Sequence, residues 1–162
     1  MAGLGEARKA RDARVALVVA LAIFVVLGAT GVFGVRTSSI SAAGGGYELT
    51  VIYPHVVRPG LAVGWEARVT HPGGFDGPVY LATTLGYFGM FDFNNLQSLP
   101  GSVINRGELT VWQFPAPVGD TLIVSMDARL SPAVQKGARA TTSVLVHGVA
   151  VVSVRYETWV MP

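Results

Sequence analysis

The chain has 162 residues and no cysteine, and 51% of its residues are hydrophobic while only 14% are charged. This length suits one ordinary domain with an additional segment. The lack of cysteine excludes disulfides, zinc–thiolate sites, a cysteine nucleophile and an acylated cysteine anchor. A mean hydropathy of +0.48, with 20 glycines and 9 prolines, is too apolar for a disordered chain and too rich in turn residues for an all-helical one.

The charges divide the chain into two parts. Residues 1–14 carry four basic and two acidic side chains, whereas residues 37–162 carry seven basic and eight acidic ones. The isoelectric point of about 9.2 therefore does not describe a basic face on the body of the protein. Nucleic acid is not an expected partner, because phosphate binding requires a clustered Lys/Arg surface.

Residues 15–35, VALVVALAIFVVLGATGVFGV, form an apolar run in which Thr30 is the only polar side chain. A helix of this length spans roughly 31 Å, the thickness of a hydrocarbon core. Four basic residues precede the run and Arg36 follows it, so the positive-inside rule places residues 1–14 in the cytoplasm. We expect a single-pass protein of the cell membrane, in contact with the lipid bilayer, with an extracytoplasmic C-terminal domain. The alternative is a cleaved signal peptide with its cleavage site within residues 39–43.

Two features adjoin this predicted span. Gly28, Gly31 and Gly34 are three residues apart and would share a loose helix face on which a second membrane helix could pack. Residues 36–46, which are mostly small and polar, predict a flexible tether with an r.m.s. reach below about 20 Å.

Beyond the tether, apolar and polar residues alternate with a period of two. The clearest case is residues 61–70, where one face holds Leu61, Val63, Trp65, Ala67 and Val69. Similar patterns predict strands at 47–53, 79–85, 108–114 and 121–130, and two more within 141–160 with a turn near His147 and Gly148. Gly- and Pro-rich loops separate these strands, and no helical segment lies between them. We therefore expect residues 47–162 to form an all-β, antiparallel Ig-like β-sandwich of six to eight strands.

The start of this domain reads YELTVIYP, then VRPG, then VGWEARV. This order resembles the opening of bacterial Ig-like and adhesion-type sandwich domains over roughly 25 residues. Trp65 would take the place of the core tryptophan, although the cysteine pair of antibody-type domains is absent. The resemblance implies a module that binds or positions other molecules.

The common signatures of catalysis do not occur in the sequence. It has no nucleophile-elbow, Walker or dinucleotide-binding pattern. His55, His71 and His147 lack the spacing that places two imidazoles on one metal. We expect His55 and His71 in exposed turns and His147 in a strand or bulge. Residues 92–95 lack the ligand pattern of a calcium loop. We therefore expect no catalytic residue, no cofactor and no metal site.

Residues 85–104 depart from the strand pattern, because they are rich in aromatic side chains and carry Asp92 as their only acidic one. An exposed apolar patch of this kind marks an interface. The candidate interface residues, toward a partner membrane protein or the outer leaflet, are Tyr87, Phe88, Met90, Phe91 and Phe93. In the alternative interpretation, half of them cap the core and residues 93–99 form a short helical turn.

Two functions follow from these features. The first is a non-enzymatic accessory or assembly subunit of a membrane protein complex, with another integral membrane protein as its partner. The second is an extracytoplasmic ligand-binding or sensory domain for a sugar, lipid or peptide, which predicts a concave pocket lined by Tyr80, Trp112 or Trp159. A membrane-tethered hydrolase is a third hypothesis and requires a His/Asp/Ser or carboxylate cluster in the folded chain.

Overall fold

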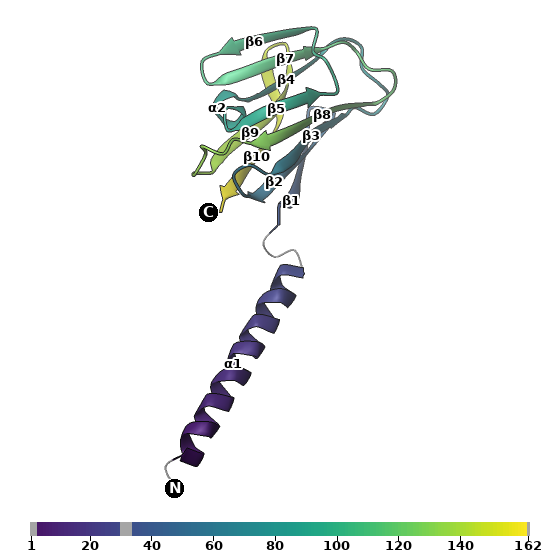
Figure 1. Cartoon of the computed structure of the whole chain (residues 1–162). Helices are drawn as coiled ribbons and strands as arrows, with labels where there is room; N and C mark the ends of the chain where they lie inside the picture. The colour runs from purple at the N-terminus through teal and green to yellow at the C-terminus, as the bar shows by residue number, and fades with distance from the viewer. Residues whose placement is uncertain (1–2, 30–33, 162) are drawn as a thin grey trace. The chain divides into compact units, whose positions relative to one another are not determined.

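A computed structural model describes residues 3–29 and 34–161, with the backbone alone for residues 3–8, 10 and 93–96. The chain divides into two compact units, Met1–Gly34 and Val35–Pro162. The first unit holds helix α1 (Gly3–Ala29), and the second holds ten strands and the one-turn helix α2 (Leu85–Phe88) (Figure 1).

Helix α1 contains a long apolar stretch. Residues Arg11–Ala29 have a mean hydropathy of 2.2, which with their length is sufficient to cross a membrane, and none of them is buried. The prediction of an N-terminal apolar helix is confirmed. That α1 is a permanent membrane anchor stays a prediction, because signal sequences share this length and composition.

The predicted glycine face is not formed as expected. Gly28 lies on α1 with no atom within 4 Å of the position that a Cβ would take. Gly31 lies outside the described residues, and Gly34 lies in a bend rather than in a helix. The prediction of a helix through Val35, with Gly34 in a packing face, is therefore wrong. The reason is that the extended strand β1 begins at Arg36, only two residues after Gly34.

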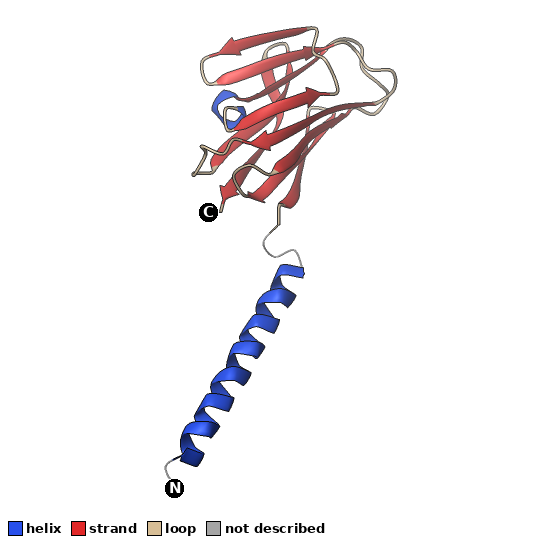
Figure 2. Ribbon diagram, viewed as in Figure 1, coloured by secondary structure: helices blue, strands red, loops and turns tan. Residues whose placement is uncertain are grey.

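The second unit is one curled sheet of ten strands (Figure 2). The strands follow the order β5-β8-β3-β2-β10-β9-β4-β7-β6, and β1 pairs with β2 outside this path. Every pairing is antiparallel except that of β2 with β10. The strands are β1 (Arg36–Gly44), β2 (Tyr47–Val57), β3 (Ala62–Thr70), β4 (Val79–Thr84), β5 (Phe91–Leu96), β6 (Ser102–Arg106), β7 (Leu109–Phe114), β8 (Thr121–Leu130), β9 (Ala138–Val146) and β10 (Val149–Val160). A mostly β fold is confirmed, but the strands exceed the expected six to eight and join in a continuous sheet.

The predicted flexible tether, residues 36–46, is instead a strand and a turn. β1 pairs with β2 from Arg36 to Gly44, and Gly45 and Gly46 make the turn at positive φ. Small residues are needed here, because a Cβ on Gly44 would lie 2.5 Å from the carbonyl oxygen of Val151. The tether prediction is wrong because backbone pairing with β2, rather than hydrophobic alternation, orders this segment.

The core follows the predicted alternation. Val63, Trp65, Ala67 and Val69 of β3 are buried, whereas Leu61 precedes the strand and is 40% exposed. The even-numbered residues of β8, from Leu122 to Leu130, are buried in the same way. Full burial of a large apolar side chain contributes roughly 1.5–3 kcal/mol, so the inner faces of these two strands are a main source of stability.

A buried hydroxyl chain connects the two halves of the curled sheet. Trp65 Nε1 on β3 donates to the hydroxyl of Tyr156 on β10 at 3.0 Å. That hydroxyl lies 2.9 Å from Thr142 Oγ1 on β9, which lies 3.1 Å from Thr83 Oγ1 on β4. Each polar group in this buried series of hydrogen bonds has a partner, as the burial of polar groups requires.

A second buried chain fixes helix α2. The Thr158 hydroxyl donates its single proton to the carbonyl oxygen of Pro54 at 2.6 Å. The Tyr87 hydroxyl, 2.8 Å from Thr158 Oγ1, must therefore be the donor in that contact. Tyr87 on α2 is thus joined to β10 and, through Thr158, to β2.

We expect stability to fall in alkali because of these two tyrosines. Burial raises the pKa of Tyr87 and of Tyr156 above the ordinary 10.0, and the hydrogen bonds of the Tyr156 hydroxyl with Thr142 and Trp65 offset the rise at Tyr156 only in part. The folded state then holds protons that the unfolded state has released, so stability is complete below pH 10 and is lost as the pH rises above it. The loss is at most about 1.4 kcal/mol per pH unit for each tyrosine. Urea midpoints measured at about pH 9 to 12 should show this fall, and Tyr87→Phe should make it shallower; a constant midpoint would contradict it.

Gly137, at the end of the loop before β9, lies directly on β10. A Cβ at this position would collide with the carbonyl oxygen of Thr158 and lie 2.9 Å from its carbonyl carbon. We expect Gly137→Ala to lower the free energy of unfolding by about 1–3 kcal/mol. Gly64→Ala is the matched control, because no atom lies within 4 Å of its Cβ position, and should be neutral or slightly stabilising. Equal urea midpoints for the two variants would show that the loop moves away freely.

Candidate functional site

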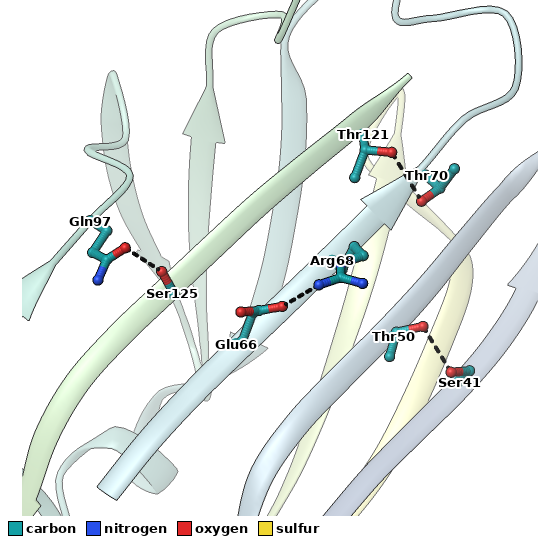
Figure 3. A network of polar contacts seen from close by, with 8 residues as sticks. All are labelled: Ser41, Thr50, Glu66, Arg68, Thr70, Gln97, Thr121 and Ser125. Atoms are coloured by element: carbon teal, nitrogen blue, oxygen red, sulfur yellow. Dashed lines mark hydrogen bonds and ion pairs between the residues drawn. The ribbon is translucent and has the colours of Figure 1, made fainter. Parts of the chain in front are cut away.

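The outer surface of β1, β2, β3 and β8 is mostly polar, with Ile123 as an exposed apolar residue on β8. Short contacts between small or charged side chains cover it, as Figure 3 shows. The pairs are Ser41–Thr50 at 2.8 Å, Glu66–Arg68 at 3.0 Å, Thr70–Thr121 at 3.4 Å and Ser125–Gln97 at 3.1 Å. Of these four contacts, Glu66–Arg68 is an ion pair, and exposed ion pairs contribute about 0–1 kcal/mol. We therefore interpret this face as a solvated surface.

The other half of the sheet has a different outer face. On β4, β7 and β9, Tyr80 lies opposite both Gln113 and Leu145, and on the adjacent row Val111 lies opposite Ile104 of β6. Residues opposite one another on a sheet face are close neighbours. The face is therefore an aromatic and aliphatic strip bordered by polar groups.

A cavity of about 340 Å³ lies on this strip. Tyr80 and Ile104, in its lining, are 36% and 49% exposed. Ser102 Oγ donates to Gln113 Oε1 at 3.0 Å, and Arg106 and the His147–Gly148 turn complete the lining. An apolar hollow with a few polar groups is typical of a binding site.

A second cavity of about 410 Å³ adjoins the first, since Tyr80, Leu145 and His147 line both. Its far side is formed by the rings of Tyr47, His71 and Phe75, whose centroids are 4.4 to 6.3 Å apart. Here and below, we call the two adjacent cavities the outer groove.

Hydrogen bonding fixes the tautomer of one imidazole in the outer groove. His71 Nδ1 lies 2.6 Å from the carbonyl oxygen of Gly74 and must donate to it. The neutral ring then keeps Nε2 as an acceptor, and the Asp76 carboxylate adds further acceptors to the lining. The groove can therefore stack against a ring and accept hydrogen bonds.

The groove continues to an exposed edge of the sheet. Strand β6 is the last strand of the order and pairs with β7 alone. Val103 and Ile104 on β6 are 55% and 49% exposed, and Leu99 in the preceding loop is 79% exposed. An apolar edge strand of this kind presents unpaired backbone groups on which another strand can pair.

The structure overturns most of the predicted aromatic interface. Tyr87 is fully buried, and Phe88, Met90 and Phe91 are each 7% exposed. The prediction is wrong for these four, because α2 directs the segment into the core, where the ring centroids of Tyr87 and Tyr156 are 5.3 Å apart. The side chain of Phe93 lies outside the described residues. Capping of the core is the interpretation that holds, with the helical turn at Leu85–Phe88 rather than at 93–99.

The aromatic residues predicted to line a pocket divide into three cases. Tyr80 lines both cavities of the outer groove. Trp112 is only 8% exposed and belongs to the core. Trp159 is 55% exposed and lines a separate shallow cavity of about 350 Å³ with Arg139 and Arg155.

The histidines also differ from expectation. His55 lies in strand β2, not in a turn, because β2 continues past Pro54 to Val57. His71 lies at a turn, and His147 lies in the turn between β9 and β10 rather than in a strand or bulge. The fold brings both to the second cavity. Within residues 3–29 and 34–161, no group of three or more His, Asp or Glu side chains could hold a metal ion.

The sequence reasoning missed the contribution of β6 and β7 to the site. Ile104, Arg106, Val111 and Gln113 line the first cavity. The alternating pattern of Leu109–Phe114 predicts a strand, whereas Ser102–Arg106 has no such alternation, and neither segment identifies which face of the sheet is hollow.

No protein-family model matches the chain, and no curated protein matches it. Among solved structures, it is similar to the alkylpurine DNA glycosylase AlkC of Pseudomonas fluorescens bound to DNA containing an abasic site analog, with 12% identity and a TM-score of 0.35 over 78% of this chain and 31% of that one. It is also similar to the GH20 exo-β-N-acetylglucosaminidase of Vibrio harveyi in complex with N-acetylglucosamine, with 11% identity and a TM-score of 0.23 over 78% of this chain and 18% of that one. The chain spans less than a third of either protein, and likenesses of this size carry no argument about fold or function.

Proposed function

We propose that the protein is a non-enzymatic accessory subunit of a membrane complex, and that it binds an extended segment of another integral membrane protein along β6. The exposed apolar edge of β6 is the observation that carries the proposal. Val103 and Ile104 are adjacent and so point to opposite faces of the sheet, and each is about half exposed. A strand added at this edge would meet apolar side chains on both faces.

The outer groove supports this mode of binding. In β-strand addition, backbone hydrogen bonds supply affinity and pockets for alternate side chains supply specificity. The first cavity is lined by Ser102, Ile104 and Arg106, the outward side chains of β6 itself. An added strand would therefore place its own outward side chains beside a hollow of about 340 Å³.

We further propose the anchoring and the side of the membrane that the sequence indicates. Helix α1 would remain as a single-pass anchor with residues 1–14 in the cytoplasm, and the β domain would be extracytoplasmic. The apolar stretch Arg11–Ala29 and the excess of basic residues before it support this arrangement.

We also propose that the domain is Ig-like, as the resemblance implies. The order β2-β3-β8-β5 corresponds to the A-B-E-D sheet of an Ig domain, and β4-β9-β10 to C-F-G, in the same chain order. The β6–β7 hairpin extends the second sheet beside β4, and β1 adds an extra strand to β2. The correspondence supports a binding module, since Ig-like sandwiches expose edges and loops to partners.

Site-specific photocrosslinking of the full chain in its native membrane tests the proposal. A photoreactive phenylalanine analogue at Val103 should give one discrete crosslinked membrane polypeptide. The same analogue at Thr50, on the polar face, should give none. Val103→Lys introduces a charge on the edge. In a chain that carries the analogue at Leu99, this substitution should abolish the crosslinked product and leave the urea midpoint unchanged.

Two outcomes would contradict the accessory-subunit proposal. Crosslinking from position 103 that is diffuse, or equal to that from position 50, would show that the edge has no partner. A product of twice the mass of the chain would identify a second copy instead of a different membrane protein.

A second candidate, a ligand-binding or sensory domain, is favoured by the ring cluster in the second cavity. Tyr47, His71 and Phe75 offer ring faces, and Asp76 and His71 Nε2 offer acceptors. Neutral mono- and disaccharides, which combine an apolar ring face with hydroxyl donors, are the probes of choice. Saturable heat of binding that Tyr80→Ala removes would favour this function over the first.

A further inference from the structure

The directions of the strands separate the charges of the β domain between its two ends. One end gathers the start of β1, the end of β2, the start of β3 and the end of β8. The strand pairings place at this same end the start of β9, the end of β10, the start of β5 and the β6–β7 turn. This end carries six basic and three acidic residues: Arg36, Arg58, Arg106, Arg129, Lys136 and Arg139 against Asp92, Glu108 and Glu157. We call it the basic end.

The opposite end has the reverse charge. Its turns and strand ends carry Glu48, Asp76 and Asp120, and no Lys or Arg lies among residues 44–48, 70–79, 96–102, 113–121 and 146–149. The domain therefore has a net charge of +3 at one end and −3 at the other, although the whole is neutral from Arg36 onward. Such a separation orients a molecule near a charged surface.

The basic end also exposes apolar side chains. Trp159 is 55% exposed, Met161 41% and Leu61 40%. Trp159 and Arg36 are both register partners of Val56, so the aromatic ring and the first basic residue of the domain lie within about two strand spacings of each other. Tryptophan beside basic side chains is the composition typical of a membrane–water interface.

The chain enters the domain at this same end. Strand β1 begins at Arg36, and residues 30–35 alone connect it to α1. Fully extended, a connection of this length covers at most roughly 20 Å. If α1 spans a membrane, the basic end is therefore the end of the domain that the covalent chain holds closest to the lipid.

We propose that the basic end binds the anionic headgroups of the bilayer, with Trp159 at the level of the headgroups. This inference rests on the proposed membrane anchor but not on the binding of a partner at β6. Each basic residue near an anionic surface strengthens binding about fivefold. The acidic end, with the second cavity beside it, would consequently be held away from the membrane.

The three tryptophans give a direct measurement. Trp65 and Trp112 are only 5% and 8% exposed, whereas Trp159 is 55% exposed and none lies in α1. The full chain would be reconstituted in nanodiscs of phosphatidylcholine alone or with about a third phosphatidylglycerol, each doped with a headgroup-spin-labelled lipid. Trp159→Phe supplies the blank, so that the difference between the two proteins is the signal of Trp159.

We expect the spin label to quench Trp159 strongly in the anionic discs and weakly in the zwitterionic ones. High salt should abolish the difference, because about 1 M salt reduces the Debye length to about 3 Å. Lys136→Glu should weaken docking about 30-fold, since it changes the charge by two units. Arg68→Glu makes the same change on the polar face of β3 and should have no effect.

The outcomes separate this inference from the anchor on which it rests. A chain that does not enter the discs overturns the anchor, and the inference with it. A chain that enters the discs but shows no quenching of Trp159, or equal quenching in both lipids, overturns the inference and leaves the anchor intact. Equal effects of Lys136→Glu and Arg68→Glu would show net charge alone at work and would also overturn it.

Discussion

Replacement of Trp65 by alanine is expected to lower the free energy of unfolding by about 3–5 kcal/mol. The side chain is 5% exposed, and its indole lies at the centre of an aromatic cluster with ring centroids 5.3 Å from Phe88 and 6.1 Å from Trp112. The variant would lose this packing and the hydrogen bond that the indole donates to the Tyr156 hydroxyl. Urea unfolding of the full chain in mild detergent, followed by the circular dichroism of the β domain, measures the loss.

A matched control and a polar companion make this prediction specific. Trp159→Ala removes the same side chain from a position that is 55% exposed and should change stability by no more than about 0.5 kcal/mol. Tyr156→Phe should cost about 1–3 kcal/mol, because the indole N–H of Trp65 becomes a buried donor without an acceptor. Tyr87→Phe should cost only about 0.5–1.5 kcal/mol, because Thr158 still donates to Pro54. Equal losses for Trp65→Ala and Trp159→Ala would contradict the burial of Trp65.

The strands with a buried inner face could be predicted from the sequence, and this explains which parts of the fold were anticipated. In β3 and β8 every second residue is apolar and buried, so the pattern itself encodes the face. The turn at His147 and Gly148 was also predicted, and both residues have positive φ. These features depend on local sequence, which is why a single chain reveals them.

Strands that are held mainly by backbone pairing escaped prediction. β1 is RTSSISAAG, in which Ile40 is the only large apolar residue. β6 is SVINR, an edge strand with four of its five residues exposed. Neither sequence has an alternation that separates it from a loop. The hollow face and the exposed edge of the candidate site therefore depend on long-range strand pairings, which cannot be predicted from a local sequence pattern.

The basic end illustrates the same limit for electrostatics. In the sequence, Arg36, Arg58, Arg129 and Lys136 are spread over about a hundred residues, and the domain is nearly neutral. Each of them lies near the start or the end of a strand, and antiparallel pairing brings these strand ends to the same end of the domain. The nearly neutral composition therefore predicted no basic surface, although the directions of the strands gather basic residues at one end.

Replacement of Phe88 by alanine decides between the core and the interface as the place of the aromatic segment. We expect a loss of about 3–5 kcal/mol in the free energy of unfolding, because the ring is 7% exposed and its centroid lies 5.3 Å from those of Trp65, Trp112 and Tyr87. The original interface hypothesis predicts the opposite, a stable domain with weakened partner association. The measurement is the urea midpoint of the full chain, combined with the yield of the crosslink from an analogue at position 99, which can also be used with a substitution at Val103.

Val103→Lys is the complementary variant, because it changes an exposed edge residue. We expect it to keep the urea midpoint of the parent chain and to lose the crosslinked partner, whereas Phe88→Ala should lower the midpoint and, in the fraction that remains folded, keep the crosslink. The reverse pattern would return the interface to residues 85–104 and remove it from β6. Together, the two variants show whether the aromatic segment stabilises the fold and the β6 edge binds the partner, or whether these two roles are reversed.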